Sequence, residues 1–532
     1  MLLDAATFDK QTIPADLCII GAGAAGISLA CALIDSGLSV LVLEAGRLDF
    51  DADTQSLYHG ENVSFNHFPL EHTRLRYFGG TTNHWNGMCA RFTAFDLAPR
   101  PGIPHTGWPL SAETLAAYYP AAEHVCQLGR VAWDDLTGWQ HAAGFPALPP
   151  MPATIMPGIA HWSPPSRFGE VYRDTLARAA NVRVLLGANV QELIADDRAA
   201  HVERAEVKCL GGPRCTITAK RFVLALGGME TTRLLLLSQR QQPAGLGNGS
   251  GLVGRFYTDH PGIDGLELRL MPSAAPAMRF FLDRIDVGNT GLCGIFQPAT
   301  ALLEQEGLGN HRFTFSTGGE VPPGIDSVRA LANVGSDAEA RTEVGRHLGN
   351  VLADIEDVAN LAYKNVAGTK AGPFPTHTGP QSLQVAVCHI SAEQFPNPDS
   401  RLTLSSERDL FGQPRIRLDW RLQDRDMHTM RRGLTLFGRA LATAGIGRLH
   451  LPRELAGDFR FLVDYAAHPM GTTRMSADPR QGIVDPDLKV HGIDNLFVAS
   501  SSVFPTGSWY NPTLTIVALA LRLADHLKET PP

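Results

Sequence analysis

Long runs of basic residues are absent from this 532-residue chain, in which 54 Asp and Glu outnumber 46 Lys and Arg. The formal net charge of −8 at pH 7 gives no support for binding to nucleic acid or to an anionic membrane. No apolar run reaches the roughly 18 residues of a membrane-spanning helix, so we expect no transmembrane segment. The N-terminal residues also lack the charged and apolar segments of a signal peptide. We therefore expect a cytoplasmic protein, although export with a partner subunit that carries the signal would leave no trace in this chain.

Clustered cysteines are absent too. The chain has eight cysteines, but they form no CxxC or CxxH cluster. Several of them lie in apolar runs, as buried free thiols do. We therefore expect neither a bound metal nor a required disulfide bond. Glycine, in contrast, is abundant at 52 residues and predicts many turns and close backbone approaches.

The best-defined motif lies close behind the N-terminus. Residues 16–20 are apolar and predict a strand buried on both faces, and residues 21–26 read GAGAAG, which fits G-x-G-x-x-G. Residues 27–36 are rich in Ala and Leu and predict a helix. Residues 39–43 predict a second buried strand, with Glu44 at its end. These elements, in this order, are typical of a dinucleotide-binding unit.

Each residue type in this unit has a physical role. Gly21 permits the tight turn, Gly23 lets the backbone approach a pyrophosphate, and Gly26 lets the helix pack close to the strand. The N-terminus of the helix offers unpaired N–H groups to the phosphates. Glu44 follows the first glycine at a spacing close to the roughly 20 residues expected for a carboxylate that binds a ribose. This unit alone leaves both FAD and NAD open as ligands.

The rest of the chain predicts an α/β protein with two domains. Residues 219–228 predict another buried strand that ends in glycines, with a helix over 230–238. Alternating stretches between 262 and 464 predict an antiparallel sheet, which a helical stretch over 326–366 would cover. The sequence pattern of the C-terminal residues is again that of the N-terminal unit, so the nucleotide-binding domain is expected to be discontinuous. The predicted boundaries are 1–100, 161–262 and 465–532 for the nucleotide-binding domain, 101–160 for a connecting or lid segment, and 263–464 for a substrate-binding domain.

The loop over residues 76–87 combines glycines, hydroxyls, a histidine and a tryptophan. On composition alone it is either a Gly-Gly turn with a capping threonine or a loop laid against a flat aromatic cofactor.

Five segments in order resemble the glucose–methanol–choline (GMC) oxidoreductase family of flavoproteins. They are residues 21–26 with Glu44, 79–85, 227–236, 254–261 and 468–515. The resemblance spans nearly the whole chain and is nearest to the pyranose oxidase and sugar dehydrogenase branch. It implies a discontinuous, Rossmann-like FAD-binding domain, a substrate domain with an antiparallel sheet covered by helices, and FAD rather than NAD as the cofactor.

The resemblance also implies roles for single residues. The family's catalytic histidine corresponds to His468, and the residue paired with it corresponds to Asn511. His468 is expected to remove the hydroxyl proton, and Asn511 to hold the hydroxyl oxygen, while hydride moves to flavin N5. His84 lies where some relatives attach FAD covalently, although many with similar loops hold FAD non-covalently. His260 and His491 lie in the flanks of motifs and are expected to be structural.

Further positions follow from the same match. Trp509 and Tyr510 stand where sugar-oxidising relatives have small residues, and are expected to narrow the substrate pocket or to stack on a ring-shaped substrate. Ser500 and Ser501 replace the acidic residue that many flavoproteins place near the flavin. The full set of expected cofactor contacts is Gly21, Gly23, Ala25, Gly26, Glu44, Ala45, Gly79, Gly80, Asn83, His84, Trp85, Ser500, Ser501, Asn511, Pro512 and Thr513.

The activity implied is FAD-dependent oxidation of a CH–OH group in a sugar, a glycoside or another ring alcohol, with O2 or another electron acceptor. Two alternatives stay open. One is a non-redox flavoprotein of the same fold, as in the family's lyase branch, and the other is an oxidase of a non-sugar alcohol or a natural-product intermediate. A non-catalytic binding subunit is disfavoured because His468 and Asn511 provide the residue types that the family uses at both catalytic positions. The oligomeric state is open, and an oligomer is compatible with the sequence.

Overall fold

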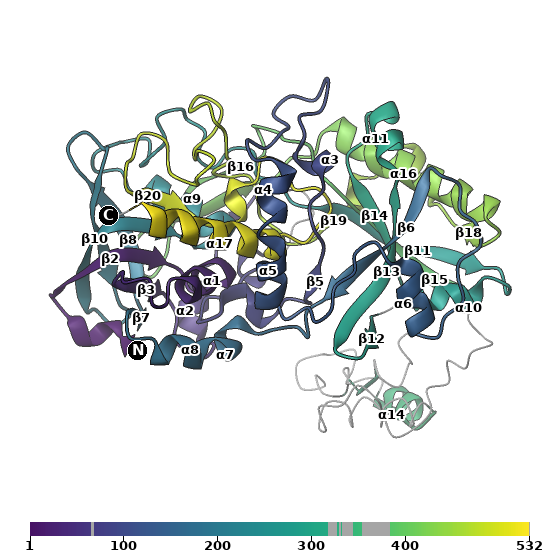
Figure 1. Cartoon of the computed structure of the whole chain (residues 1–532), viewed down its shortest axis with the longest axis horizontal. Helices are drawn as coiled ribbons and strands as arrows, with labels where there is room; N and C mark the ends of the chain where they lie inside the picture. Colours follow the sequence, from purple (N-terminus) through teal and green to yellow (C-terminus); the bar gives the residue numbers. More distant parts are fainter. Residues whose placement is uncertain are drawn as a thin grey trace.

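A computed structural model describes residues 1–64, 69–282, 284–317, 327–328, 331, 344–353 and 384–530 of the chain. Two large sheets, one mostly parallel and one antiparallel, lie side by side along the longest axis of the molecule (Figure 1). This arrangement confirms the predicted α/β class, in which one part is built on a mostly parallel sheet and the other on an antiparallel sheet.

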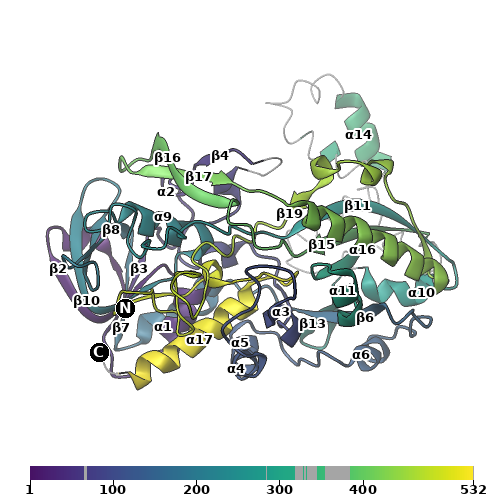
Figure 2. The same ribbon diagram turned by 90° about the horizontal axis from the view of Figure 1, so that it is seen from above.

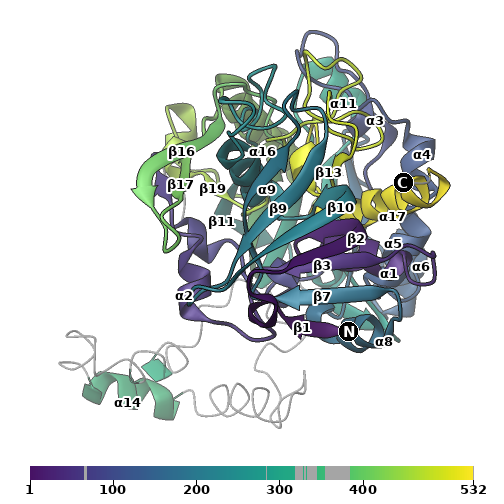
Figure 3. The same ribbon diagram turned by 90° about the vertical axis from the view of Figure 1, so that its left-hand side faces the viewer.

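The first sheet has eight strands in the order β1–β7–β3–β2–β10–β9–β8, and β20 pairs with β10 (Figure 3). The strands are β1 (Leu2–Asp4), β2 (Thr12–Ile20), β3 (Val40–Glu44), β7 (Val182–Leu186), β8 (Asn189–Ala195), β9 (Val202–Lys208), β10 (Arg214–Leu224) and β20 (Leu496–Val498). All pairs are parallel except those of β9 with β8 and β10. Ile20 pairs with both Leu43 and Leu224, so the carboxyl ends of β2, β3 and β10 meet at one edge. Ligands of such sheets bind at this edge.

Helix α1 (Ala24–Ala32) follows the glycine-rich turn, with Gly23 as its N-cap. It begins and ends earlier than the predicted helix over 27–36. The prediction was wrong at the C-terminal end because the chain leaves the helix at Leu33, and Asp35 adopts a left-handed φ of 60°. Helix α17 (Thr513–Glu529) packs against α1 (Figure 1). The C-terminal region therefore supplies both β20 and α17, which makes this part of the molecule discontinuous in sequence.

The second sheet is antiparallel, in the order β18–β11–β15–β14–β13–β6–β5, with β12 on β13 and β19 on β11. Its strands are β5 (Met88–Cys89), β6 (Ile155–Trp162), β11 (Pro261–Leu270), β12 (Ile285–Val287), β13 (Thr290–Pro298), β14 (His311–Thr317), β15 (Val385–Ala392), β18 (Gly447–Leu449) and β19 (Asp464–Tyr465). Helix α16 (Asp424–Thr443) covers one face (Figure 2). Phe437 of α16 stacks on Phe313 of β14, with 3.8 Å between ring centroids. The expected antiparallel sheet with helices over it is confirmed, and the cover that the structure describes is α16 rather than the predicted stretch over 326–366.

A small third sheet joins β4 (Glu61–Asn62) to β16 (Arg401–Arg408) and β17 (Pro414–Asp419). It packs against α9 (Gly227–Leu237), the helix that follows β10. The shorter helices are α2 (Ala52–Ser56), α3 (Ala94–Leu97), α4 (Ala112–Ala116), α5 (Tyr119–Val125), α6 (Leu136–Ala142), α7 (Phe168–Val171), α8 (Arg173–Arg178), α10 (Ala275–Met278), α11 (Thr300–Glu306) and α14 (Val344–Ala353). Apart from α14 and three other residues, the helical stretch predicted over 326–366 lies outside the described residues. Among the described residues, no helix combines the length and the apolar character that a bilayer crossing requires.

Candidate active site

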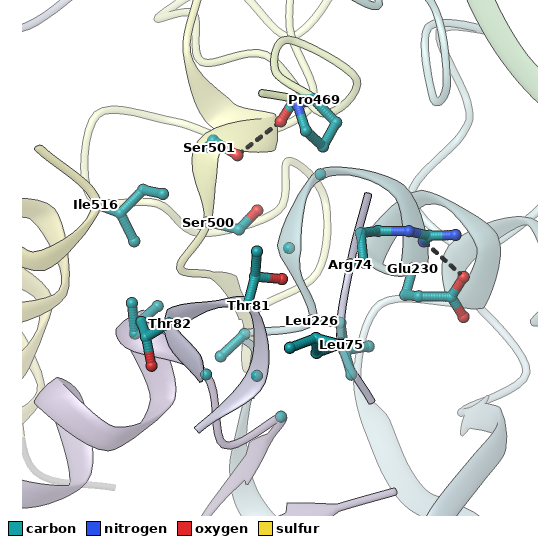
Figure 4. Close-up of a pocket in the computed structure, with 18 of the residues that line it drawn as sticks. Arg74, Leu75, Thr81, Thr82, Leu226, Glu230, Pro469, Ser500, Ser501 and Ile516 are labelled. Carbon is teal, nitrogen blue, oxygen red and sulfur yellow. Dashed lines mark hydrogen bonds and ion pairs between the residues drawn. The ribbon is translucent and has the colours of Figure 1, made fainter. Parts of the chain in front are cut away.

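A cavity opens at the carboxyl ends of β2, β3 and β10 and encloses about 1110 Å³ of empty space, including the part open to solvent. Figure 4 shows that its lining side chains come from segments far apart in the sequence: Thr81 and Thr82, Leu226 and Glu230, and Ser500 and Ser501. Ser501 also donates a hydrogen bond of 2.7 Å to the carbonyl of Pro469, which holds the loop around Pro469 against the cavity. The cavity therefore lies where the fold predicts a dinucleotide.

The glycine-rich turn forms one side of the cavity. Gly21 has a φ of 109°, and a Cβ there would lie 2.5 Å from the carbonyl oxygen of Ala225. A Cβ on Gly26 would overlap the carbonyl oxygen of Gly21. Gly23 differs, because a Cβ there would meet no atom within 4 Å and would instead enter the cavity. The turn thus leaves free space beside exposed backbone N–H groups at the start of α1, as a bound pyrophosphate requires.

Glu44 lies at the end of β3 and lines the same cavity. Its carboxylate accepts hydrogen bonds from the backbone N–H of Ala22 at 3.0 Å and of Gly46 at 2.9 Å. Burial raises the pKa of Glu44, and these backbone donors oppose the rise. The carboxylate keeps further lone pairs, so a ribose hydroxyl could donate to it as predicted. The glycine turn and this buried acid together fit the pyrophosphate and the ribose of a dinucleotide such as FAD.

The structure brings most of the predicted cofactor contacts together. Those that line the cavity are Gly21, Gly23, Ala25, Glu44, Ala45, Gly80, Trp85, Ser500, Ser501, Pro512 and Thr513, together with the predicted base His468. The predicted residues outside its lining are Gly26, Gly79, Asn83, His84, Asn511, Trp509 and Tyr510.

His84 is exposed at the end of the loop that follows Gly79. The loop is held by Arg167, whose Nη1 donates to the carbonyls of Thr82 and Trp85 at 3.0 Å each. A covalent bond from His84 to the flavin stays a prediction.

Sequence reasoning missed an ion network on the cavity wall. Glu230 pairs with Arg74 and with Arg76, each at 3.1 Å, and Arg233 adds a longer contact of 3.5 Å (Figure 4 shows the Arg74 pair). Burial opposes ionisation of Glu230, but the three guanidinium groups lower its pKa to about 2. No local pattern could have revealed the contacts of Glu230 with Arg74 and Arg76, which lie 156 and 154 residues before it in the chain.

His468 makes a contact that the sequence did not predict. Its Nδ1 lies 3.0 Å from Nδ1 of His260, and Nε2 of His260 lies 3.3 Å from the carbonyl oxygen of Gly507. A carbonyl can only accept, so we assign the proton of neutral His260 to Nε2. Nδ1 of His260 then accepts from Nδ1–H of His468, and Nε2 of His468 keeps a free lone pair. His260, expected to be merely structural, thus orients the predicted base.

Both imidazoles are neutral at ordinary pH. Burial, followed by the charge of Arg312, lowers the pKa of His468 to about 3. Burial also takes the pKa of His260 well below its usual value. His468 is therefore ready to accept a proton without first losing one.

Asp259 anchors this pair through the backbone. Its Oδ1 accepts from the N–H of His260 at 2.7 Å and from the N–H of His468 at 2.9 Å. Asp259 is fully buried, and burial raises its pKa to about 7 despite these bonds. One carboxyl oxygen thus fixes both histidines, although 208 residues separate them.

Replacing Asp259 with alanine should leave two buried N–H groups without an acceptor, at a cost of about 1–3 kcal/mol each. We expect a lower free energy of unfolding in urea and slower reduction of the flavin. Asp259→Asn is the matched control, because its amide oxygen can still accept both bonds. If the asparagine variant is as impaired as the alanine variant, the charge and not the acceptor is what matters.

The same pair of variants tests a pH effect. Asp259 has a folded pKa of about 7 against its usual 3.8, so its contribution to stability is fully present below pH 3.8 and is lost as pH rises through 7. Asp259→Asn should remove this component, which would flatten the loss of stability between about pH 4 and 7. An unchanged slope would contradict the assignment.

Asn511, Trp509 and Tyr510 are buried beside the cavity. Asn511 is 7 % exposed, and Oδ1 of its amide has no hydrogen-bond partner within the part of the chain that the structure describes. Its Nδ2 makes one long hydrogen bond of 3.5 Å to Asn86. The rings of Trp509 and Tyr510 pack on each other with centroids 4.0 Å apart, and Tyr510 packs on Phe92. Their role in a substrate pocket, and that of Asn511 at the reacting hydroxyl, stay predictions.

Comparison with known proteins agrees with this geometry. Residues 16–253 match the family described as FAD dependent oxidoreductase, and residues 396–520 match the family described as GMC oxidoreductase. The first range contains the glycine-rich turn and Glu44, and the second contains His468 and Asn511.

Two curated relatives and one solved structure align over almost the whole chain. The 6'''-hydroxyparomomycin C oxidase of Streptomyces lividus is 26% identical over 96% of this chain and 92% of its own. The fructose dehydrogenase large subunit of Gluconobacter japonicus is 24% identical over 97% and 98%. The crystal structure of a formate oxidase superposes with a TM-score of 0.56 at 18% identity, covering 98% of this chain and 99% of that one, and so shares the fold.

Proposed function

This chain belongs to the GMC oxidoreductase family of FAD-dependent enzymes, and from that premise we propose that it oxidises a CH–OH group of a sugar, a glycoside or another ring alcohol to a carbonyl. One observation carries the proposal: Nδ1 of the cavity-lining His468 is engaged by His260, which leaves Nε2 free to act as a base. The relatives named 6'''-hydroxyparomomycin C oxidase and fructose dehydrogenase large subunit support a sugar-like substrate.

Polar side chains lie on the face of the second sheet opposite α16. Nδ1–H of His389 on β15 donates to the carboxylate of Asp264 on β11 at 3.0 Å, and its Nε2 accepts from the hydroxyl of Ser316 on β14 at 3.0 Å. Thr314 pairs with His389 across the strands and points to the same face. These side chains are only partly buried or exposed, so they offer hydroxyl, imidazole and carboxylate groups to a ligand.

In the proposed reaction, Nε2 of His468 takes the hydroxyl proton from the substrate. His260 keeps His468 in the required tautomer, and Asp259 holds the backbone of both. Asn511 is proposed to steady the oxygen from which the proton leaves. The glycine turn and Glu44 would hold FAD, which would provide the acceptor for the hydride. The chain itself thus contributes orientation and one proton transfer.

Anaerobic visible spectroscopy of the purified FAD-loaded protein tests the proposal. Sugars, glycosides, polyols and aromatic alcohols are added one at a time, and we expect at least one ring alcohol to bleach the flavin band near about 450 nm. A flavin that none of them bleaches would contradict the proposal and favour the non-redox alternative. Admission of air or of an artificial acceptor then separates an oxidase from a dehydrogenase. Acid precipitation of the same sample shows whether the flavin is bound covalently.

A further inference from the structure

Arg312 lies on β14 and points towards the candidate active site. Side chains alternate along a strand, and its neighbour Phe313 stacks under Phe437 of α16. Arg312 therefore faces the opposite side of the sheet, where its guanidinium lies 5.0 Å from the ring centroid of Trp509. Trp509 follows two residues after Gly507, whose carbonyl contacts His260, so Arg312 lies on the same side of the site as the proposed base. Its charge accordingly lowers the pKa of both His468 and His260.

The guanidinium of Arg312 has poor partners inside the protein. Its Nη1 donates to the thioether sulfur of Met88 at 2.9 Å, and a thioether is a weak acceptor. Its Nε is buried and has no hydrogen-bond partner among the described residues. No carboxylate lies within ion-pair distance of Arg312 in the described ranges of the chain. Burial accordingly lowers the pKa of Arg312 to about 10, which still leaves it charged at pH 7.

Each of the other buried arginines donates to a carboxylate or, in Arg221 and Arg474, to a backbone carbonyl, both of which are stronger acceptors than a thioether. Arg100 binds both carboxylate oxygens of Glu393, and Arg233 binds Asp409 at 2.6 Å. A buried cation without such a counter-ion is costly, so it is retained where a ligand supplies the negative charge. Arginine has a planar fork of donors that matches a carboxylate, and Trp509 holds that fork in one orientation by stacking.

We propose that Arg312 is a specificity residue that binds a carboxylate on the alcohol substrate, as in an acidic sugar. This inference rests on the proposed function for the reaction itself. Ser391, the cross-strand partner of Arg312, adds a hydroxyl on the same face. The substrate would then lie with its acidic group against β14 and its reacting hydroxyl at His468.

The test compares wild type, Arg312→Gln and Arg312→Lys in the FAD-loaded form at pH 8. Two probes that differ only at one carbon are used, methyl glucoside and the corresponding methyl glucuronide, together with benzoate as a carboxylate that cannot be oxidised. Benzoate binding is read from the change in the flavin absorption spectrum. Arg269→Gln, which removes an exposed arginine from β11, controls for the loss of one positive charge.

We expect wild type to favour the glucuronide, and Arg312→Gln to weaken benzoate binding and raise KM for the glucuronide about 10–100-fold. Its KM for the glucoside should change little, Arg312→Lys should recover part of the loss because it keeps the charge, and Arg269→Gln should behave as wild type. Added salt should weaken benzoate binding in wild type more than in Arg312→Gln.

Two results would overturn the proposal. One is unchanged benzoate binding in Arg312→Gln. The other is an equal loss of flavin reduction with both sugars, which would place Arg312 at the reacting oxygen instead. The groups that face Arg312, namely His468, His260, Cys293 and Asp264, do not change between the variants, so the comparison isolates the guanidinium. Benzoate binding needs no turnover, so failure of the proposed reaction would leave this result interpretable.

Discussion

Replacing His468 with alanine is expected to slow anaerobic reduction of the bound flavin by an alcohol about 10²–10⁴-fold, the usual contribution of a general base. The reason is that Nε2 of His468 is the free imidazole nitrogen of the pair with His260. FAD should stay bound, because the glycine turn and Glu44 lie on other elements. Stopped-flow absorbance of the flavin band gives the rate, and the spectrum after gel filtration gives the amount of FAD retained.

His491→Ala is a suitable control for this experiment. His491 lies in the same C-terminal region, and its Nε2 contacts the carbonyl of Ser476 at 2.9 Å. The substitution removes an imidazole that makes one hydrogen bond, and His491 does not line the cavity. We expect its reduction rate to equal that of wild type. Equal rates in wild type and His468→Ala would remove His468 from the mechanism.

The low pKa of His468 determines how the rate of flavin reduction in the wild-type protein depends on pH. Burial and then Arg312 lower the pKa of His468 to about 3, so the imidazole is neutral, and able to accept a proton, above that pH. The reduction rate should therefore stay level from about pH 8 to 5 and fall only towards pH 3. An acid limb near pH 6.5, the usual pKa of histidine, would contradict this account of the site.

Gly23→Val is expected to abolish FAD binding at micromolar concentrations while the protein still folds. A Cβ at Gly23 meets no protein atom within 4 Å, and its φ of −89° suits any L-residue. The added side chain would instead fill the space that we assign to the pyrophosphate, and we expect Kd for FAD to rise at least about 100-fold. Titration of the apoprotein with FAD by fluorescence quenching measures the loss, and circular dichroism reports the fold.

Gly457→Val is the matched control for Gly23→Val. Gly457 lies in an exposed turn with a φ of −112°, and the nearest contact of an added Cβ is 3.8 Å away. FAD binding should be unchanged in this variant. Gly26→Val should behave in a third way and unfold the protein, because its Cβ would overlap the backbone of Gly21. If Gly23→Val binds FAD as tightly as wild type, the pyrophosphate does not lie against this turn.

The dinucleotide-binding unit was predictable because its determinants are local. Strand, glycine turn, helix and second strand all fall within residues 12–44, and each follows from spacing and residue type, although β2 begins four residues before the predicted strand. The predicted end of α1 was wrong because neither Leu33 nor Asp35 marks a helix end by residue type, and the surrounding residues are mostly helix formers. The antiparallel second sheet followed from alternation. The sequence did not predict that β5 and β6 belong to this sheet. β5 pairs with β6, and β6 pairs with β13, so both strands depend on contacts between distant segments.

The fold class and the position of the glycine cradle could be read from the amino-acid sequence, and the family resemblance identified His468 as the candidate base. The groups that surround that base could be identified only in the folded molecule. Asp259, His260 and Arg312 are far from His468 in the chain, and no periodicity links them to it. Local patterns report how a segment folds, whereas the pKa of a buried group depends on whatever charges and donors the fold brings beside it. For this reason the tautomer of His468 and the unpaired charge of Arg312 could be seen only in three dimensions.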